Sequence, residues 1–149
     1  MPLVCRYVAL HVPELRAAEE FYCRALGLHV LFREATKGND WLTLPVGKGW
    51  EAADEAGIEL GMVALSHDDF VLALFPGSPT PGSLYEICLG LEADRVDALG
   101  ARLPDGAEVV ERRPGLVRFV DPYGFRWVVQ DLGLAFRSSG EIGGRWLEL

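Results

Sequence analysis

Glu86 and Cys88 are the side chains of this sequence whose types best suit chemistry inside a binding cavity. They lie two positions apart in the apolar stretch 84–91, so a strand there would place both on one face. A carboxylate on an inner face is costly to bury unless it is paired. Glu86 therefore either meets a cationic or hydrogen-bonding ligand or is neutralised by an arginine such as Arg118 or Arg126. Cys88 would need nearby positive charge to become a nucleophile, and because its neighbour is an acid we interpret it as a small filler of the cavity wall.

Tyr7 and His11 form a second candidate pair, on a strand predicted over residues 6–12. The apolar residues of this strand alternate with them, so both project from the face opposite to the core. Tyr7 could stack on a ligand or donate its hydroxyl, or it is a core tyrosine whose tip reaches the rim. His11 could move a proton or donate a hydrogen bond, or it is a histidine at the rim without a task.

Gln130 and Trp41 are further candidates for contact with a ligand. Gln130 shares a strand face with Val128 and could fix a polar group of the ligand, while Trp41 could form an aromatic wall or pack in the core. Trp41 lies in the stretch 35–60, which is the hardest to place. We expect a short strand around Trp41 and a loop or a single helical turn over the acidic, alanine-rich residues 50–57.

Composition and charge exclude several classes of protein. The 149 residues carry 14 basic and 22 acidic side chains, for a net charge of −8, which makes nucleic acid an unlikely partner and favours a neutral or cationic small molecule. No apolar run is long enough to cross a membrane, and the first residues lack a signal-peptide pattern. The three cysteines cannot all pair, so we expect reduced thiols and a cytoplasmic location. Neither a phosphate-binding loop nor a nucleophile elbow is present.

Two successive sets of elements must position these side chains. The first set is predicted as a strand, a helix, a strand and a hairpin, over residues 6–12, 15–26, 28–33, 62–65 and 70–75. The second set has the same order, over residues 84–91, 93–103, 107–111, 116–120 and 125–131. A proline-rich linker, residues 76–82, separates them. We expect one domain with module one at about 4–75, module two at about 83–132 and an extension at 133–149.

A shift of 79 residues aligns the two modules. It places the apolar face of the first strand on residues 87, 89 and 91, and it places Gly27, which ends the first helix, on Gly106. We interpret this as an internal duplication.

Two motifs carry a resemblance to a known family. The first is Leu10-His-Val-Pro-Glu-Leu-Arg-Ala-Ala-Glu-Glu-Phe-Tyr-Cys-Arg-Ala-Leu-Gly, and the second is Val117-Arg-Phe-Val-Asp-Pro-Tyr-Gly-Phe-Arg-Trp. With the module order, they resemble the vicinal oxygen chelate superfamily of glyoxalase I, bleomycin-resistance proteins and extradiol dioxygenases. The resemblance implies an α+β fold in which two tandem βαβββ modules form an open, cup-shaped mixed sheet with helices on its outer side. It also implies a ligand on the concave face and, in many members, a homodimer.

Metal-using members of that superfamily place one ligand on the first strand and one on the last strand of each module. By resemblance, these positions fall on Tyr7 and Glu86 for the first strands and on Ala73 and Val128 for the last. Alanine and valine offer no lone pair and neutral tyrosine is a poor donor, so only Glu86 could coordinate a metal. Glu59, in a segment that resembles another ligand segment of the family, is an alternative to Ala73 and would raise the count only to two carboxylates. We therefore expect no metal site and no cofactor.

These expectations favour a metal-independent protein of the bleomycin-resistance type that binds a small organic molecule. The predicted polar contacts are Tyr7, His11, Glu86 and Gln130, and the predicted walls are Trp41, Val71, Ala73, Phe75 and Val128. The alternative is an enzyme of the same superfamily, a glyoxalase-like lyase or isomerase or a dioxygenase, with Glu86 or His11 as general base. A third interpretation is a regulatory or interaction domain whose cup is filled by its own side chains.

The extension 133–149 lies beyond the resemblance. It contains four glycines and yet ends in Trp146-Leu-Glu-Leu. Because an apolar end of this kind is usually buried, we expect it to pack across the sheet or onto a second subunit.

Overall fold

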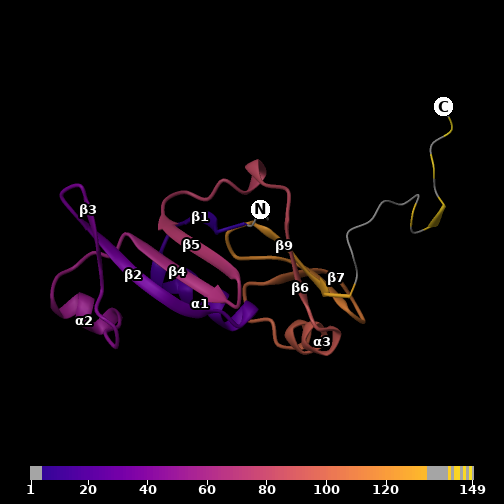
Figure 1. Cartoon of the computed structure of the whole chain (residues 1–149), viewed down its shortest axis with the longest axis horizontal. Helices are drawn as coiled ribbons and strands as arrows, with labels where there is room; N and C mark the ends of the chain where they lie inside the picture. The colour runs from indigo at the N-terminus through magenta and orange to yellow at the C-terminus, as the bar shows by residue number, and fades with distance from the viewer. Residues whose placement is uncertain (1–4, 134–140, 142, 145, 147, 149) are drawn as a thin grey trace, which may run out of the picture.

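The computed structural model describes residues 5–133 together with 141, 143, 144, 146 and 148. Within these residues the chain forms two β-sheets, and the helices lie beside and between them (Figure 1). None of the described helices is long and apolar enough to cross a lipid bilayer. The predicted packing of the extension 133–149 depends largely on residues outside this description.

The first sheet contains five strands in the order β1-β5-β4-β2-β3. Its main elements are β1 (Val8–Val12), α1 (Leu15–Leu26), β2 (His29–Lys37), β4 (Met62–His67) and β5 (Phe70–Pro76). Strands β1 and β5 run parallel, and the other neighbours are antiparallel. The stretch that was hardest to predict supplies β3 (Asp40–Thr43) at the sheet edge and the short helix α2 (Trp50–Glu55).

The second sheet repeats this topology with four strands in the order β6-β9-β8-β7. Its elements are β6 (Ile87–Leu91), α3 (Ala93–Ala101), β7 (Glu108–Arg113), β8 (Leu116–Val120) and β9 (Arg126–Asp131). Strands β6 and β9 are parallel, as β1 and β5 are in the first sheet. A single turn of 3-10 helix, η1 (Pro81–Ser83), lies in the connection between the sheets. The predicted α+β fold of two tandem βαβββ modules is confirmed.

The two long helices end differently. Gly27 follows α1 with φ of 67°, a left-handed conformation that glycine adopts without a steric penalty. Helix α3 ends at Ala101, with Arg102 as its cap, which is close to the predicted end at 103, and Gly106 lies beyond the helix. The reason is Pro104, which disfavours helical geometry at Leu103 and stops the helix before Gly106 is reached.

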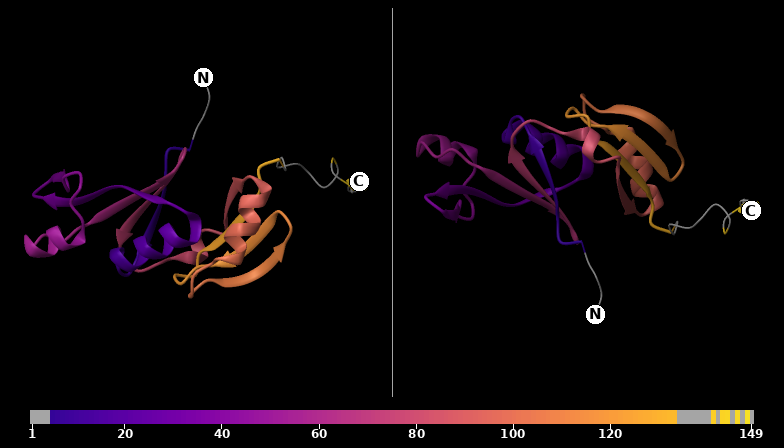
Figure 2. Two further views of the ribbon diagram at one scale, coloured as in Figure 1. Left: turned by 90° about the horizontal axis from the view of Figure 1, so that it is seen from below. Right: turned by 90° about the horizontal axis from the view of Figure 1, so that it is seen from above.

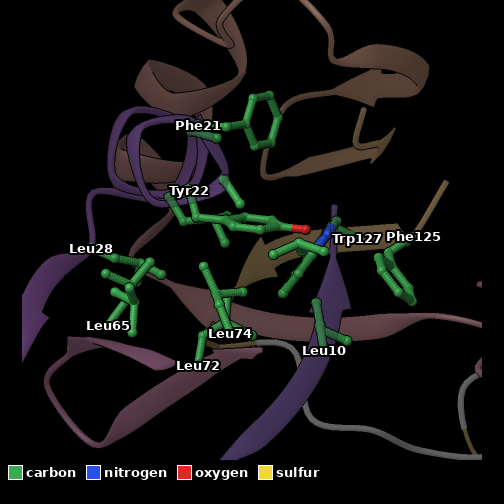
Figure 3. Packing of buried hydrophobic residues seen from close by; sticks show 14 of the residues in the cluster. Leu10, Phe21, Tyr22, Leu28, Leu65, Leu72, Leu74, Phe125 and Trp127 are labelled. Carbon is green, nitrogen blue, oxygen red and sulfur yellow. The ribbon is translucent and has the colours of Figure 1, made fainter. Parts of the chain in front are cut away.

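One hydrophobic core joins the modules. Helix α1 lies between the two sheets (Figure 2), and its Tyr22 packs against Trp127 of β9 with ring centroids 5.6 Å apart. Figure 3 shows these two rings pointing toward each other above the leucines of the first sheet. Trp127 and Val129 are fully buried, as their strand alternation predicts. Because the helix-facing sides of both sheets contribute to this core, the opposite sides of both sheets lie on the outside of the chain.

Candidate functional site

Six of the predicted ligand-binding residues lie on or next to the outer side of the first sheet. Leu72 and Leu74 of β5 are fully buried in the core, so the alternating residues of this strand face outward. Strand register places five of them on this side, and Tyr7 lies immediately before β1; the five are His11, Trp41, Val71, Ala73 and Phe75. Ala73 lies between Ala9 of β1 and Ala64 of β4, so three short side chains stand in a row. They form a low apolar floor.

Larger side chains border this floor. The rings of Trp41 and Phe75 meet edge to face with centroids 6.3 Å apart. On the same border, His11 of β1 is the register partner of Phe75, and it lies directly against Gly77, where an added Cβ atom would stand 2.6 Å from the His11 Nδ1 atom. Tyr7, immediately before β1, is 62% exposed. The first sheet therefore offers an apolar floor with an aromatic border and one imidazole.

The outer side of the second sheet is charged instead. Arg118 of β8 donates a hydrogen bond from Nε to the Glu86 carboxylate at 3.3 Å. The same guanidinium donates from its Nη1 atom to Glu111 of β7, which also lies 3.7 Å from the Nε atom of Arg113. Arg118 therefore bridges two carboxylates, and of the two arginines that could neutralise Glu86, Arg118 does so.

Arg126 of β9 has no acidic partner in the described part of the chain, unlike Arg118. Its guanidinium carbon lies 5.2 Å from the centre of the Tyr85 ring, a cation–π contact, and Tyr85 itself is 76% exposed. The Nε atom of Arg126 is buried and has no hydrogen-bond partner. A buried donor without an acceptor is rare in folded proteins.

The remaining predicted residues of this face lie beside the ion pairs. Val128 is buried between Cys88 of β6 and Arg118 of β8. Gln130 is half-buried, two residues further along β9, with Gly90 as its neighbour on β6. Glu86, Val128 and Gln130 thus occupy the second sheet and the other six predicted residues the first sheet, so one chain divides them between two outer faces.

Cys88 is an exposed free thiol on the charged face. Partial burial raises the pKa of Cys88, the Glu86 carboxylate raises it further, and the Arg118 guanidinium lowers it. The balance of these effects keeps the thiol protonated, which agrees with its interpretation as a wall residue and not as a nucleophile.

The alkylation rate of Cys88 reports on this charge arrangement. We expect Glu86→Gln to speed the reaction of Cys88 with iodoacetamide by about two- to threefold at mildly alkaline pH, and Arg118→Gln to slow it, because the thiolate is the reactive form. Mass spectrometry of peptides measures the rate, and the exposed thiol of Cys5 is the reference within the same molecule. If the ratio of the Cys88 rate to the Cys5 rate is the same in the unchanged chain and in both variants, then Glu86 and Arg118 do not control the reactivity of Cys88.

The four positions that the resemblance assigns to metal ligands do not suit a metal ion. Ala73 and Val128 carry no donor atom, Tyr7 offers a neutral phenol, and the Glu86 carboxylate is bonded to Arg118. Ala73 lies on the last strand of module one, whereas Glu59 precedes β4 in a loop. Among the described residues, no group of three or more His, Cys, Asp or Glu side chains could hold a metal ion.

Comparisons with known proteins agree with this fold. A family model described as the Glyoxalase/Bleomycin resistance protein/Dioxygenase superfamily matches residues 5–129. The chain belongs to this superfamily. A search of curated proteins finds no match.

Solved structures show the same fold at low sequence identity. The fosfomycin resistance protein FosX from Listeria monocytogenes, complexed with Mn(II) and a sulfate ion, is 12% identical with a TM-score of 0.62, over 90% of this chain and 96% of that one. A possible glyoxalase from Bacillus cereus is 21% identical with a TM-score of 0.55, over 87% and 99%. A glyoxalase-related enzyme from Fulvimarina pelagi is 17% identical with a TM-score of 0.53, over 86% and 87%. The superfamily fold is shared, whereas these identities are too low to transfer an activity.

Sequence reasoning missed the residue that connects the two modules. Asp121 of the β8–β9 turn accepts hydrogen bonds from the Tyr22 hydroxyl and from Trp127 Nε1, the latter at 2.8 Å. Its other oxygen accepts from the backbone N–H groups of Tyr123 and Phe125. The motif Asp121-Pro-Tyr-Gly predicts the tight turn itself. Its hydrogen-bond partner on α1, Tyr22, is 99 residues away in the sequence, so no local pattern indicates this contact.

Proposed function

We propose that the chain binds a small organic molecule on the outer faces of its sheets without a metal ion, as a protein of the bleomycin-resistance type does. The observation that carries this proposal is the ion pair between Glu86 and Arg118 at 3.3 Å. Glu86 has the only anionic oxygen donor among the four superfamily ligand positions, and this pairing commits the carboxylate to a guanidinium. FosX, by contrast, has been solved in complex with Mn(II).

The two faces supply different contacts for such a molecule. The apolar floor of the first sheet suits a planar or aliphatic group, and Trp41 and Phe75 border it. On the second sheet, the half-buried Arg126 has no acidic partner among the described residues, and its guanidinium, next to the exposed ring of Tyr85, would donate to a ligand carbonyl oxygen. The ligand we propose is neutral or cationic overall, because the chain carries a net charge of −8.

We also propose a homodimer in the cytoplasm. One chain turns its two outer faces away from its core, and they expose large aromatic rings, among them Tyr7 and Tyr85. A second copy that brings the apolar face of one chain against the charged face of the other would enclose a ligand between them. The three free thiols, Cys5, Cys23 and Cys88, suit a reducing compartment.

Binding of bleomycin, a basic glycopeptide, tests the proposal. We expect saturable binding to the full chain in a buffer that contains EDTA, measured by isothermal titration calorimetry. Arg126→Gln is expected to weaken binding about tenfold, because a charge-assisted hydrogen bond is lost. The matched control is Arg6→Gln, an exposed arginine before β1 with no ion pair among the described residues.

Two results would overturn parts of the proposal. A chain purified without chelator that retains stoichiometric Zn²⁺, Ni²⁺ or Fe²⁺ through dialysis would contradict metal independence and favour the enzyme alternative. Bleomycin binding that is absent, or equal in both arginine variants, would contradict the assignment of the ligand to this class and to this face.

A further inference from the structure

A cavity of about 370 Å³ lies where the two modules meet, away from the outer faces of the sheets. Its apolar walls come from the end of α1, from β5, from β6 and from α3; they include Leu26, Leu28, Phe70, Leu89, Leu91 and Leu99. This volume falls within the range of small-molecule sites, which begins at about 300 Å³. The carboxylates of Asp68 and Asp69, at its rim, are exposed to solvent.

A second, basic cavity of about 240 Å³ borders the first. The two share Leu26, His67, Leu91 and Leu99, so they lie side by side, and we name them together the junction groove. Arginines line the basic end, with Arg24 from α1 and Arg95 and Arg102 from α3 or its cap. The groove is therefore apolar at one end and cationic at the other.

Stabilisation by the helix dipole does not by itself explain why three arginines lie at this end of the groove. Arg24 and Arg102 lie near helix C-termini, where a cation is stabilised by the helix dipole, but Arg95 lies in the first turn of α3, where the dipole favours an anion. The Asp94 carboxylate in that turn accepts a hydrogen bond from the backbone N–H of Arg95 at 3.0 Å, so it is bonded to the backbone of the helix start and not to the Arg95 side chain. Arg95 and Arg102 are seven residues apart and so lie on one side of α3.

The arginines of the groove have few partners in the described part of the chain. Arg24 lies 3.9 Å from Glu20, and both of these side chains are largely exposed. His67 lies 3.7 Å from Asp68. Arg95 and Arg102 form no side-chain ion pair with any described residue, so their guanidinium groups are available to a ligand.

We propose that the junction groove binds a free amphipathic carboxylate, with its alkyl chain in the apolar end and its carboxylate at Arg95 and Arg102. The apolar walls gain from the burial of methylene groups, and the guanidinium groups match a carboxylate in shape and charge. Since the walls belong to both modules, the ligand holds the modules together. This site is separate from the outer faces and does not depend on the function proposed for them.

Titration of decanoate into the full chain tests the proposal, below the concentration at which decanoate forms micelles. We expect saturable binding by calorimetry, with changes in amide NMR spectra confined to residues of the groove. Arg95→Glu should weaken binding at least about tenfold, whereas Arg6→Glu, the same charge change before β1, should leave it unchanged. Decanol should bind more weakly than decanoate, and shortening the carboxylate should weaken binding about fourfold for each buried methylene group removed.

The proposal is overturned by any of three results. The first is that Arg95→Glu binds decanoate as tightly as the unchanged chain does. The second is that decanol binds as tightly as decanoate, and the third is that the spectral changes map to the outer faces of the sheets. Circular dichroism of Arg95→Glu establishes that this exposed substitution leaves the fold intact, so that lost binding is attributable to the lost charge.

Discussion

Replacement of Asp121 with alanine is expected to lower the free energy of unfolding by about 4 kcal/mol, because four donors lose their acceptor at once. Asp121 is only 4% exposed. The Tyr22 hydroxyl and Trp127 Nε1 would then be left buried and unpaired between the modules. Burial and the Asp121 carboxylate raise the pKa of Tyr22 far above its ordinary value of 10.0, so the phenol remains a donor at neutral pH.

Urea denaturation followed by far-UV circular dichroism measures this loss. Asp97→Ala is the matched control, because Asp97 is exposed and accepts a single hydrogen bond, from the backbone of Gly115 at 2.9 Å. We expect the control to lose no more than about 1 kcal/mol. If Asp121→Ala loses as little as Asp97→Ala, then the Asp121 hydrogen bonds do not hold the modules together.

Periodicity in the sequence was sufficient to predict the order of elements in both modules and which side chains of a strand face the core. The alternation in 125–131 correctly placed Trp127 and Val129 in the core, since a strand turns every second side chain to the same side. Phe21 and Tyr22 likewise have helical spacing with the other apolar residues of α1, and both rings are buried in the core. These features depend on neighbours in the sequence, and for that reason a local pattern can reveal them.

Contacts between distant elements could not be predicted in this way. The sequence left Arg118 and Arg126 open as partners of Glu86, and the choice depends on how β7, β8 and β9 are aligned. Strand β7 contains an irregularity between Val109 and Glu111, which shifts its register against β8. Such a shift moves side chains from one face of a sheet to the other, and no residue type in the sequence announces it.

The position of the two sheets relative to each other also depends on contacts between residues that are far apart in the sequence. The resemblance implies one cup, whereas the described chain forms two separate hydrogen-bonded sheets whose helix-facing sides share one core. The hydrogen bond that the Tyr22 hydroxyl of α1 donates to Asp121 crosses between the modules and stabilises this arrangement. The predicted ligand-binding residues therefore lie on two separate faces, one apolar and one charged, and the homodimer proposed above is the arrangement that would bring two such faces together.

Glu19→Ala is expected to lower the free energy of unfolding by about 3 kcal/mol, because it leaves a buried guanidinium without its counter-charge. Glu19 accepts hydrogen bonds from Arg33 Nε at 2.7 Å and Nη2 at 3.0 Å, and from Trp50 Nε1 at 2.9 Å. The side chains of Glu19 and Arg33 are 12% and 15% exposed. This carboxylate ties α1 to β2 and α2.

The adjacent residue provides the control. Glu20 lies 3.9 Å from Arg24 with both side chains mostly exposed, and Glu20→Ala should cost less than about 0.5 kcal/mol. Urea denaturation compares the two variants, and equal losses would contradict the role of the buried pair. Because β2 carries the edge strand β3 with Trp41, we also expect Glu19→Ala to disturb the aromatic border of the first face, which Glu20→Ala leaves intact. Helical spacing places Glu19 on the buried side of α1 with Leu15 and Tyr22, but its charge partners come from β2 and α2, and no local pattern in the sequence indicates them.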